Sequence, residues 1–370
     1  MIRNAVLSRA LIVFTLHLCL PSQAAAAEAG WEVEWERTVK AAEQEGQVVV
    51  YKIAQDAEWH AFQKKFPKIK VVLIQGNAAQ IQQRLLAERR AGKFLADVVR
   101  LGGGTSTSLY KAKALDPIGP ALMLAEVKDV SKWFDGKHHY NDIDNQFVFV
   151  YAAFPLHLLG YNQKLVDPKT LTSYWDLLDP RWKGKITLKD PQEPGGQSPL
   201  LFLYHNPQLG PEYLKKLFSA ATALTLVRND RLQTDWLAAG KFPLTLTSKA
   251  TEVEEAKNQG LPVDILDANA FRKDGVALEA GGTMLALMNK ATHTNAAKVL
   301  INWFLSREGQ MAIQKTGAND SGQNSLREDI PKEHLPASLQ RQRGVKYIRL
   351  WGAEVWDRDA VTKFVGELVK

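Results

Sequence analysis

Short apolar segments alternate with longer segments of helical spacing, and this alternation constrains the fold more than any other feature of the sequence. Val48–Tyr51, Ile69–Ile74 and Asp97–Leu101 are predicted to be buried strands because each is short and largely apolar. Between the last two, Ala78–Ala91 is predicted to be a helix that begins after the capping residue Asn77. Strands that alternate with helices form largely parallel sheets covered by helices, so we expect an α/β protein.

The same alternation returns later in the chain and predicts a second α/β unit. Leu224–Val227 and Phe242–Thr247 are expected strands, with the helix Arg231–Ala239 between them. Two further strands, near Phe147–Ala152 and Ala277–Leu287, are placed to cross between the units. We therefore expect two lobes, each a mixed, largely parallel sheet flanked by helices, joined by a hinge of two crossing strands.

The length of 370 residues is consistent with two domains. We expect lobe 1 to comprise residues 28–150 and 277–325, and lobe 2 to comprise residues 151–276 and 326–370. No Gly/Ser-rich linker separates them.

Residues 1–27 have the order of regions that is typical of a secretory signal peptide. Arg3 and Arg9 precede the apolar run Ala10–Leu20, and the small residues Ala24–Ala27 follow. This run is too short for a membrane-spanning helix, which needs about 20 residues. Cys19, the single cysteine, lies inside the segment, so the cleaved protein would have no disulfide and no thiol chemistry. We expect a protein that is exported to the periplasm.

The composition, with 45% hydrophobic and 24% charged residues, is that of an ordinary soluble globular protein. Its formal net charge of +7 is mild for this length. Arg84, Arg89 and Arg90 are interrupted by Glu88, which indicates a solvated helix face rather than a basic stripe. We expect no nucleic-acid partner.

The patterns that would indicate an enzyme are incomplete. Gly102–Thr105 follows a strand and opens a helix, but it lacks the lysine of a P-loop, so a tight turn and an anion contact both remain open. Gly196–Leu200 lacks the final glycine of a nucleophile elbow. His138 and His139 are adjacent and point to different faces, which does not favour a metal site. We expect no catalytic residue, no metal and no cofactor.

Five segments, taken in order, resemble the ferric-iron-type periplasmic solute-binding proteins of ABC importers, which have the type II periplasmic-binding-protein fold. They are Tyr51 after an apolar strand, Ala96-Asp97-Val98, the segment from Trp175 to Ile186, Ala238-Ala239-Gly240, and the segment from Asn295 to Gln310. The resemblance implies a two-lobed cleft that closes on a small ligand and then docks on a membrane permease.

The iron site of that family does not carry over to this sequence. The resemblance implies that iron-binding members use a histidine, a glutamate and a tyrosine pair at positions that here hold Gln55, Gly102 and Thr247-Ser248. Ferric ion is a hard cation that prefers anionic oxygen donors, and an amide, a glycine and two hydroxyls do not supply them. We expect the fold of the family without its metal.

The ligand site is expected at the carboxyl ends of the strands, where open α/β sheets bind their ligands. The candidate ligand-binding residues are Lys52, Gln55, Asn77, Gly103, Gly104 and Thr105 in the first lobe, Gln197, Ser198, Arg228, Asn229, Thr247, Ser248 and Lys249 in the second, and Glu279 near the crossover. Several of these residues open helices, whose N–H groups suit an anion. Arg228 and Lys249 either add positive charge there or are ordinary surface residues.

The sequence thus predicts a monomeric periplasmic protein that captures a small organic or anionic solute and delivers it to the permease of an ABC importer. Two alternatives stay open. One is a ferric-ion-binding protein with non-standard ligands, and the other is a ligand-sensing protein that presents its closed form to a membrane receptor.

Overall fold

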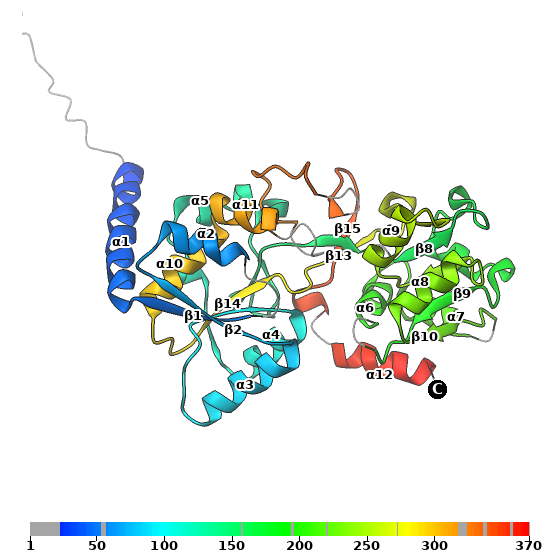
Figure 1. Cartoon of the computed structure of the whole chain (residues 1–370), viewed down its shortest axis with the longest axis horizontal. Helices are drawn as coiled ribbons and strands as arrows, with labels where there is room; N and C mark the ends of the chain where they lie inside the picture. The colour runs from blue at the N-terminus through cyan, green and yellow to red at the C-terminus, as the bar shows by residue number, and fades with distance from the viewer. Residues whose placement is uncertain are drawn as a thin grey trace, which may run out of the picture.

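The structure is a computed structural model that describes residues 23–52, 57–156, 158–193, 196–219, 221–271, 273–316, 324–335, 339–355 and 358–369. It confirms the two-lobed α/β fold, and Figure 1 shows the lobes side by side with β13 and β15 between them. The expected signal peptide lies almost wholly outside the described residues. Within the ranges given, no helix is both long enough and apolar enough to cross a membrane.

The first lobe is built on a seven-stranded sheet of order β2-β1-β3-β14-β6-β5, with β4 paired to β14. Its strands are β1 (Gln47–Lys52), β2 (Lys70–Gln75), β3 (Val98–Leu101), β4 (Leu115–Asp116), β5 (His139–Tyr140), β6 (Val148–Val150) and β14 (Met284–Met288). The strands β2, β1 and β3 run parallel, whereas β14 returns antiparallel between β3 and β6. The carboxyl ends of β1 and β3 therefore lie at one edge of this sheet.

Helices flank this sheet, and local sequence signals set where several of them begin. They are α1 (Gln23–Glu45), α2 (Ala57–Lys65), α3 (Ala78–Arg90), α4 (Gly103–Lys111), α5 (Ala125–Lys128), α10 (Thr294–Leu305) and α11 (Arg307–Thr316), with the 3-10 turns η1 (Gly119–Ala121), η2 (Val130–Lys132) and η3 (Phe134–Gly136). Asn77 caps α3 as predicted, because its side chain accepts from the backbone N–H of Gln80 and the side chain of Gln80 accepts in return.

The second lobe has a five-stranded sheet of order β10-β9-β11-β8-β12, with β10, β9 and β11 parallel. Its strands are β8 (Leu159–Asn162), β9 (Ile186–Lys189), β10 (Thr225–Val227), β11 (Leu244–Leu246) and β12 (Val263–Ile265). Its helices are α6 (Ser198–His205), α7 (Gly210–Leu217), α8 (Asp230–Ala238) and α9 (Ala250–Asn258), with η4 (Pro168–Thr170), η5 (Tyr174–Leu178), η6 (Pro180–Trp182) and η7 (Ala268–Phe271). Here too the carboxyl ends of neighbouring parallel strands share one edge.

A third sheet joins the lobes, and it differs from the two crossing strands that the sequence predicts. The strand expected near Phe147–Ala152 is β6 of the first sheet, and the one expected near Ala277–Leu287 is divided between the third sheet and β14. In the third sheet β7 (Phe154–Leu156) pairs antiparallel with β13 (Val276–Glu279), and β15 (Tyr347–Arg349) pairs with the other edge of β13. After β15 the chain forms η9 (Ala353–Val355) and the last helix, α12 (Arg358–Leu368), which packs on α6 of the second lobe. The C-terminal segment is therefore part of the hinge.

Each lobe has its own hydrophobic core, and the C-terminal segment contributes to both. Trp351 belongs to the first core, whereas Leu350 and Val361 belong to the second. The limits that the sequence assigns to the two lobes stay a prediction.

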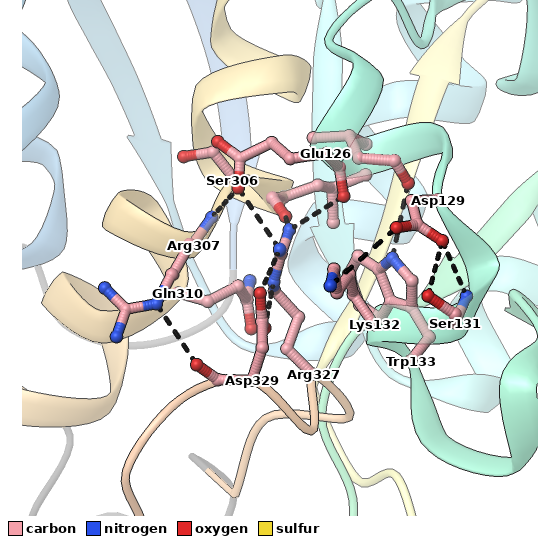
Figure 2. Close-up of polar contacts among 12 residues, drawn as sticks. Glu126, Asp129, Ser131, Lys132, Trp133, Ser306, Arg307, Gln310, Arg327 and Asp329 are labelled. Carbon is pink, nitrogen blue, oxygen red and sulfur yellow. Dashed lines mark hydrogen bonds and ion pairs between the residues drawn. The ribbon is translucent and has the colours of Figure 1, made fainter.

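A buried arginine fastens the segment 324–335 to the first lobe, as Figure 2 shows. Arg327 donates from Nε and Nη2 to the two carboxylate oxygens of Asp329, at 2.9 and 2.8 Å. Its Nη2 also lies 3.1 Å from the carboxylate of Glu126 on α5, and its Nη1 donates to the carbonyl of Leu305 at 3.0 Å. Because a buried guanidinium needs partners for its charge and its N–H groups, this set of contacts fixes the path of the segment.

Candidate functional site

The candidate site lies at the carboxyl ends of the strands in both lobes, where α/β sheets bind ligands. In the first lobe, Lys52 ends β1 but is fully buried, and its ammonium lies 5.4 Å from the ring centroid of Trp59. Asn77 is exposed, and its side-chain oxygen accepts from the N–H of Gln80 in the cap of α3. Gln55 lies outside the described residues. The first lobe therefore offers a ligand fewer of the expected side chains than the sequence predicts.

The start of α4 offers backbone donors at this edge. Gly102, directly after β3, is the N-cap and has no side chain to accept from the first turn. The first N–H that closes the helix is that of Ser106, so the N–H groups of Gly103, Gly104 and Thr105 have no intrahelical acceptor. Such groups, together with the helix dipole, favour an anion. The side chain of Thr105 is buried in the lobe, so it contributes its backbone only.

Arg358, which the sequence analysis missed, brings a positive charge to the same place. A β-carbon built on Gly103 would lie only 3.0 Å from Nη2 of Arg358, so the guanidinium packs directly against the glycine backbone. Burial lowers the pKa of Arg358, and the charge of Glu279 at the end of β13 opposes that shift. Arg358 begins α12, so a residue of the C-terminal helix contacts the first lobe and faces the hinge.

Two glycines, Gly102 and Gly281, allow the hinge to approach the start of α4 closely. A β-carbon on Gly102 would lie 3.3 Å from the carbonyl oxygen of Gly281, and Gly281 itself has a φ of +51°. A residue with a side chain would be crowded at the first position and strained at the second. The loop that follows Glu279 is thereby held beside the start of α4.

The edge of the second lobe carries cations, but carboxylates of the same lobe accompany them. Lys189, at the end of β9, forms an ion pair with Asp230 at 2.7 Å. Arg228 is 79% exposed, and its Nε lies 3.5 Å from Asp190 and 3.8 Å from Glu193. Because these charges largely offset one another, the edge is polar without a strong positive potential.

Lys249 also lies near a carboxylate, and the other expected residues of this edge lie at the starts of helices. Nζ of Lys249 lies 3.5 Å from the carboxylate of Glu252, and both belong to the start of α9. Asn229 caps α8 by accepting from the N–H of Leu232 at 3.0 Å. Gln197 is exposed at the N-cap of α6 without a capping bond, and Ser198 is the first residue of that helix. Gln197, Asn229 and Lys249 are exposed, so their polar side chains are accessible at this edge.

Thr247 and Ser248 follow β11, and the backbone of Thr247 is strained. Thr247 has a φ of +65°, which a β-branched residue rarely adopts, and its Oγ1 accepts from the N–H of Lys189 at 3.0 Å. The turn directs Ser248 inward, where its Oγ is buried and has no hydrogen-bond partner among the described residues. A β-carbon on Gly160 of β8 would lie 3.2 Å from this hydroxyl. A buried hydroxyl without a partner at a strand end marks a place where a ligand polar group could bind.

The structure thus brings together two groups of the expected residues and separates the rest. Gly103 and Gly104 lie at the start of α4 near Arg358, on whose pKa Glu279 acts. Arg228, Thr247 and Ser248 lie in the loops that follow β10 and β11 of the second lobe. Among the described residues, no three side chains of His, Cys, Asp or Glu gather in a way that would hold a metal ion. The arrangement provides hydrogen-bond donors and one additional cation for a ligand.

Comparison with known proteins agrees with this geometry. A sequence profile of the bacterial extracellular solute-binding proteins matches residues 59–319. No curated protein sequence matches the chain.

Several solved structures have the same fold at low sequence identity. Iron-bound HitA from Pseudomonas aeruginosa is 18% identical over 87% of this chain and 99% of that one, with a TM-score of 0.59. IdiA (FutA) from Trichodesmium, in complex with iron and citrate, is 18% identical over 87% and 99%, with a TM-score of 0.67. Apo FutA2 from Synechocystis is 16% identical over 87% and 98%, with a TM-score of 0.64. These likenesses support the two-lobed fold.

Proposed function

The chain belongs to the bacterial extracellular solute-binding proteins, and from this premise we propose that it captures a small organic solute with an anionic group and delivers it to an ABC importer. The solute binds between the lobes, in the periplasm, and the protein acts as a monomer. This function is binding and transport, and it requires no catalytic residue or cofactor.

The observation that carries the proposal is the contact of Arg358 with Gly103. It places a guanidinium beside three backbone N–H groups at the start of α4. A guanidinium binds carboxylate and phosphate oxygens in pairs, and the N–H groups supply further donors. The anionic group of the solute therefore binds here, on the first lobe.

The second lobe supports recognition of the remainder of the solute. Arg228 is exposed at its edge beside Asp190, and the hydroxyl of Ser248 is buried nearby without a partner among the described residues. Groups of both signs suit a solute with hydroxyl or amino groups better than a second strong anion. We propose that closing the hinge at β7, β13 and β15 brings this edge onto the bound solute.

A ferric-ion-binding protein with non-standard ligands is a second candidate. It is supported by the two similar structures that hold iron, HitA and IdiA. Against it stand the hydroxyls of Thr247 and Ser248, which are weak donors for ferric ion. An absorption band in the visible after ferric ion is added would favour this candidate.

Native mass spectrometry of gently purified protein tests the proposal, since a retained solute would appear as added mass. The identified solute is then titrated against wild type, Arg358→Gln and Arg228→Ala. We expect Arg358→Gln to weaken binding by roughly tenfold or more, the loss expected for a charge-assisted hydrogen bond. Arg228→Ala should have a smaller effect, because that side chain is exposed and already lies near two carboxylates. A retained solute without any anionic group would contradict the proposal.

A further inference from the structure

A pocket of about 380 Å³ lies beside the hinge, at the opposite edge of the first sheet from β2. Its described lining residues come from 137–145 and from 349–353 only, and none comes from the second lobe's strand-end loops. They include neither the glycines at the start of α4 nor Arg358, so the pocket is distinct from the place where the anionic group of the solute is proposed to bind. Its volume lies in the range of small-molecule sites in proteins.

The pocket has a buried floor and an exposed mouth. His139 of β5 and Trp351 after β15 are buried and form the floor, with their ring centroids 5.7 Å apart. Lys137 and Asn145 are exposed and line the mouth. Tyr140 lines the wall between them. Aromatic walls of this kind accommodate an apolar body, while polar groups at the mouth set its orientation.

Two cations, Lys137 and Arg349, line the pocket, and His139 contacts Arg349. Nε2 of His139 lies 2.9 Å from the carbonyl oxygen of Phe134, which can only accept, so Nε2 carries the proton. Burial lowers the pKa of His139 to about 4, so the ring is neutral near pH 7 and its Nδ1 is an acceptor. This Nδ1 lies 3.5 Å from Nη1 of Arg349. The contact positions the guanidinium at the pocket from the edge of the hinge sheet.

The two walls of the pocket come from different parts of the fold. His139 and Tyr140 form β5, the edge strand of the first sheet, whereas Arg349 ends β15 of the hinge sheet. The chain then continues through Trp351 to α12 on the second lobe. A molecule in the pocket would contact both the first lobe and the segment that leads to the second.

From this geometry we propose that the pocket is a second binding site, separate from the interlobe site, for a small carboxylate with a flat apolar body. The carboxylate binds to Arg349 and Lys137, and the apolar body packs against Trp351 and Tyr140. Lys137 and Arg349 are the two cations among the described lining residues of the pocket. A guanidinium matches the planar geometry of a carboxylate.

Calorimetric titration of the purified protein with benzoate tests the proposal. Benzamide, which has the same ring without the charge, tests the role of the carboxylate, and inorganic phosphate tests whether charge alone suffices. We expect benzoate to bind measurably better than either. Arg349→Gln should weaken benzoate binding by about tenfold or more, and Arg349→Lys, which keeps the charge without the fork, by less.

Matched controls separate this site from the interlobe site. Arg343→Gln removes an exposed arginine of the same segment that does not line this pocket, and it should leave benzoate binding unchanged. Arg358→Gln alters the interlobe site, so the binding event that Arg349→Gln weakens should persist in it. If Arg358→Gln abolished benzoate binding while Arg349→Gln did not, benzoate would occupy the interlobe site and this inference would be overturned, whereas the proposed function would gain support. An absence of benzoate binding to folded wild-type protein, as judged by circular dichroism, would overturn it as well.

Discussion

Nη2 of Arg358 lies 3.0 Å from the point that a β-carbon would occupy on Gly103, so the first residue of the last helix rests against the start of α4. The two residues lie far apart in the sequence, and their contact joins the C-terminal segment to the first lobe. It also defines where the proposed anion would bind.

Gly103→Ala should weaken solute binding without loss of stability. The added methyl group would push the guanidinium away from the N–H groups of α4, while alanine itself is well tolerated in a helix. We expect affinity to fall by a few-fold in a titration with the identified solute. Gly104→Ala is the matched control, because a β-carbon there meets nothing within 4 Å. Equal affinities for both variants would show that Arg358 does not depend on this contact.

Two substitutions at Thr247 should separate backbone strain from hydrogen bonding. Thr247→Val keeps the strained φ and removes the acceptor for the N–H of Lys189, so the free energy of unfolding should fall by about 1–3 kcal/mol. Thr247→Gly removes the same acceptor but relieves a strain of order 1 kcal/mol or more, so it should be closer to wild type. Chemical denaturation measures both. A glycine variant less stable than the valine variant would rule out the strain.

Arg327→Met should be strongly destabilising. It would leave Asp329 and the carbonyl of Leu305 without their buried partner, and breaking a buried ion pair costs about 3–5 kcal/mol. The control is Arg307→Gln, since Arg307 is exposed and its Nε donates to the backbone carbonyl of Asp329. That variant should lose less than about 1 kcal/mol. Thermal and denaturant unfolding of the two variants would distinguish them, and similar losses would contradict the role given to Arg327.

Lys332 should make stability depend on pH in the alkaline range. Burial, together with the charge of Arg341, lowers the pKa of Lys332 from 10.5 to about 7, against the opposing effect of Glu328 and Asp329. Between these two pKa values the unfolded chain binds a proton that the folded protein does not, so the free energy of unfolding should rise with pH from about 7 to 10.5.

Lys332→Met should remove this rise, and denaturation across that pH range tests it. The matched variant Lys346→Met changes an exposed lysine of the same C-terminal region and should keep the rise. A wild-type stability that stayed flat over this range would contradict the lowered pKa.

Much of the fold follows from local signals in the sequence. The helix α3 begins after its cap Asn77 as predicted, and α4 begins at the glycines that follow β3. Strands such as β9 and β11 are short apolar segments, and a helix follows each of them along the chain. Signals of this kind depend on neighbouring residues only.

The candidate site was harder to predict because its contacts join distant segments. Nothing near Arg358 in the sequence indicates that its guanidinium packs against Gly103. Likewise, Arg228 reads as a cation available to a ligand, and only the folded loops place Asp190 and Glu193 beside it. The side chain of Ser248 points inward because Thr247 has a positive φ. A threonine in the sequence gives no sign of this backbone conformation. Strand β15 was missed for the same reason, since its partner β13 lies far away in the chain.

The placement of the first and last described helices gives a way to watch the lobes move. The helix α1 packs on α10 of the first lobe, whereas α12 packs on α6 of the second. Fluorescent donor and acceptor groups attached to α1 and to the end of α12 would therefore be carried by different lobes. Energy transfer between them would report hinge closure directly, so the protein could serve as a biosensor that screens for its own solute.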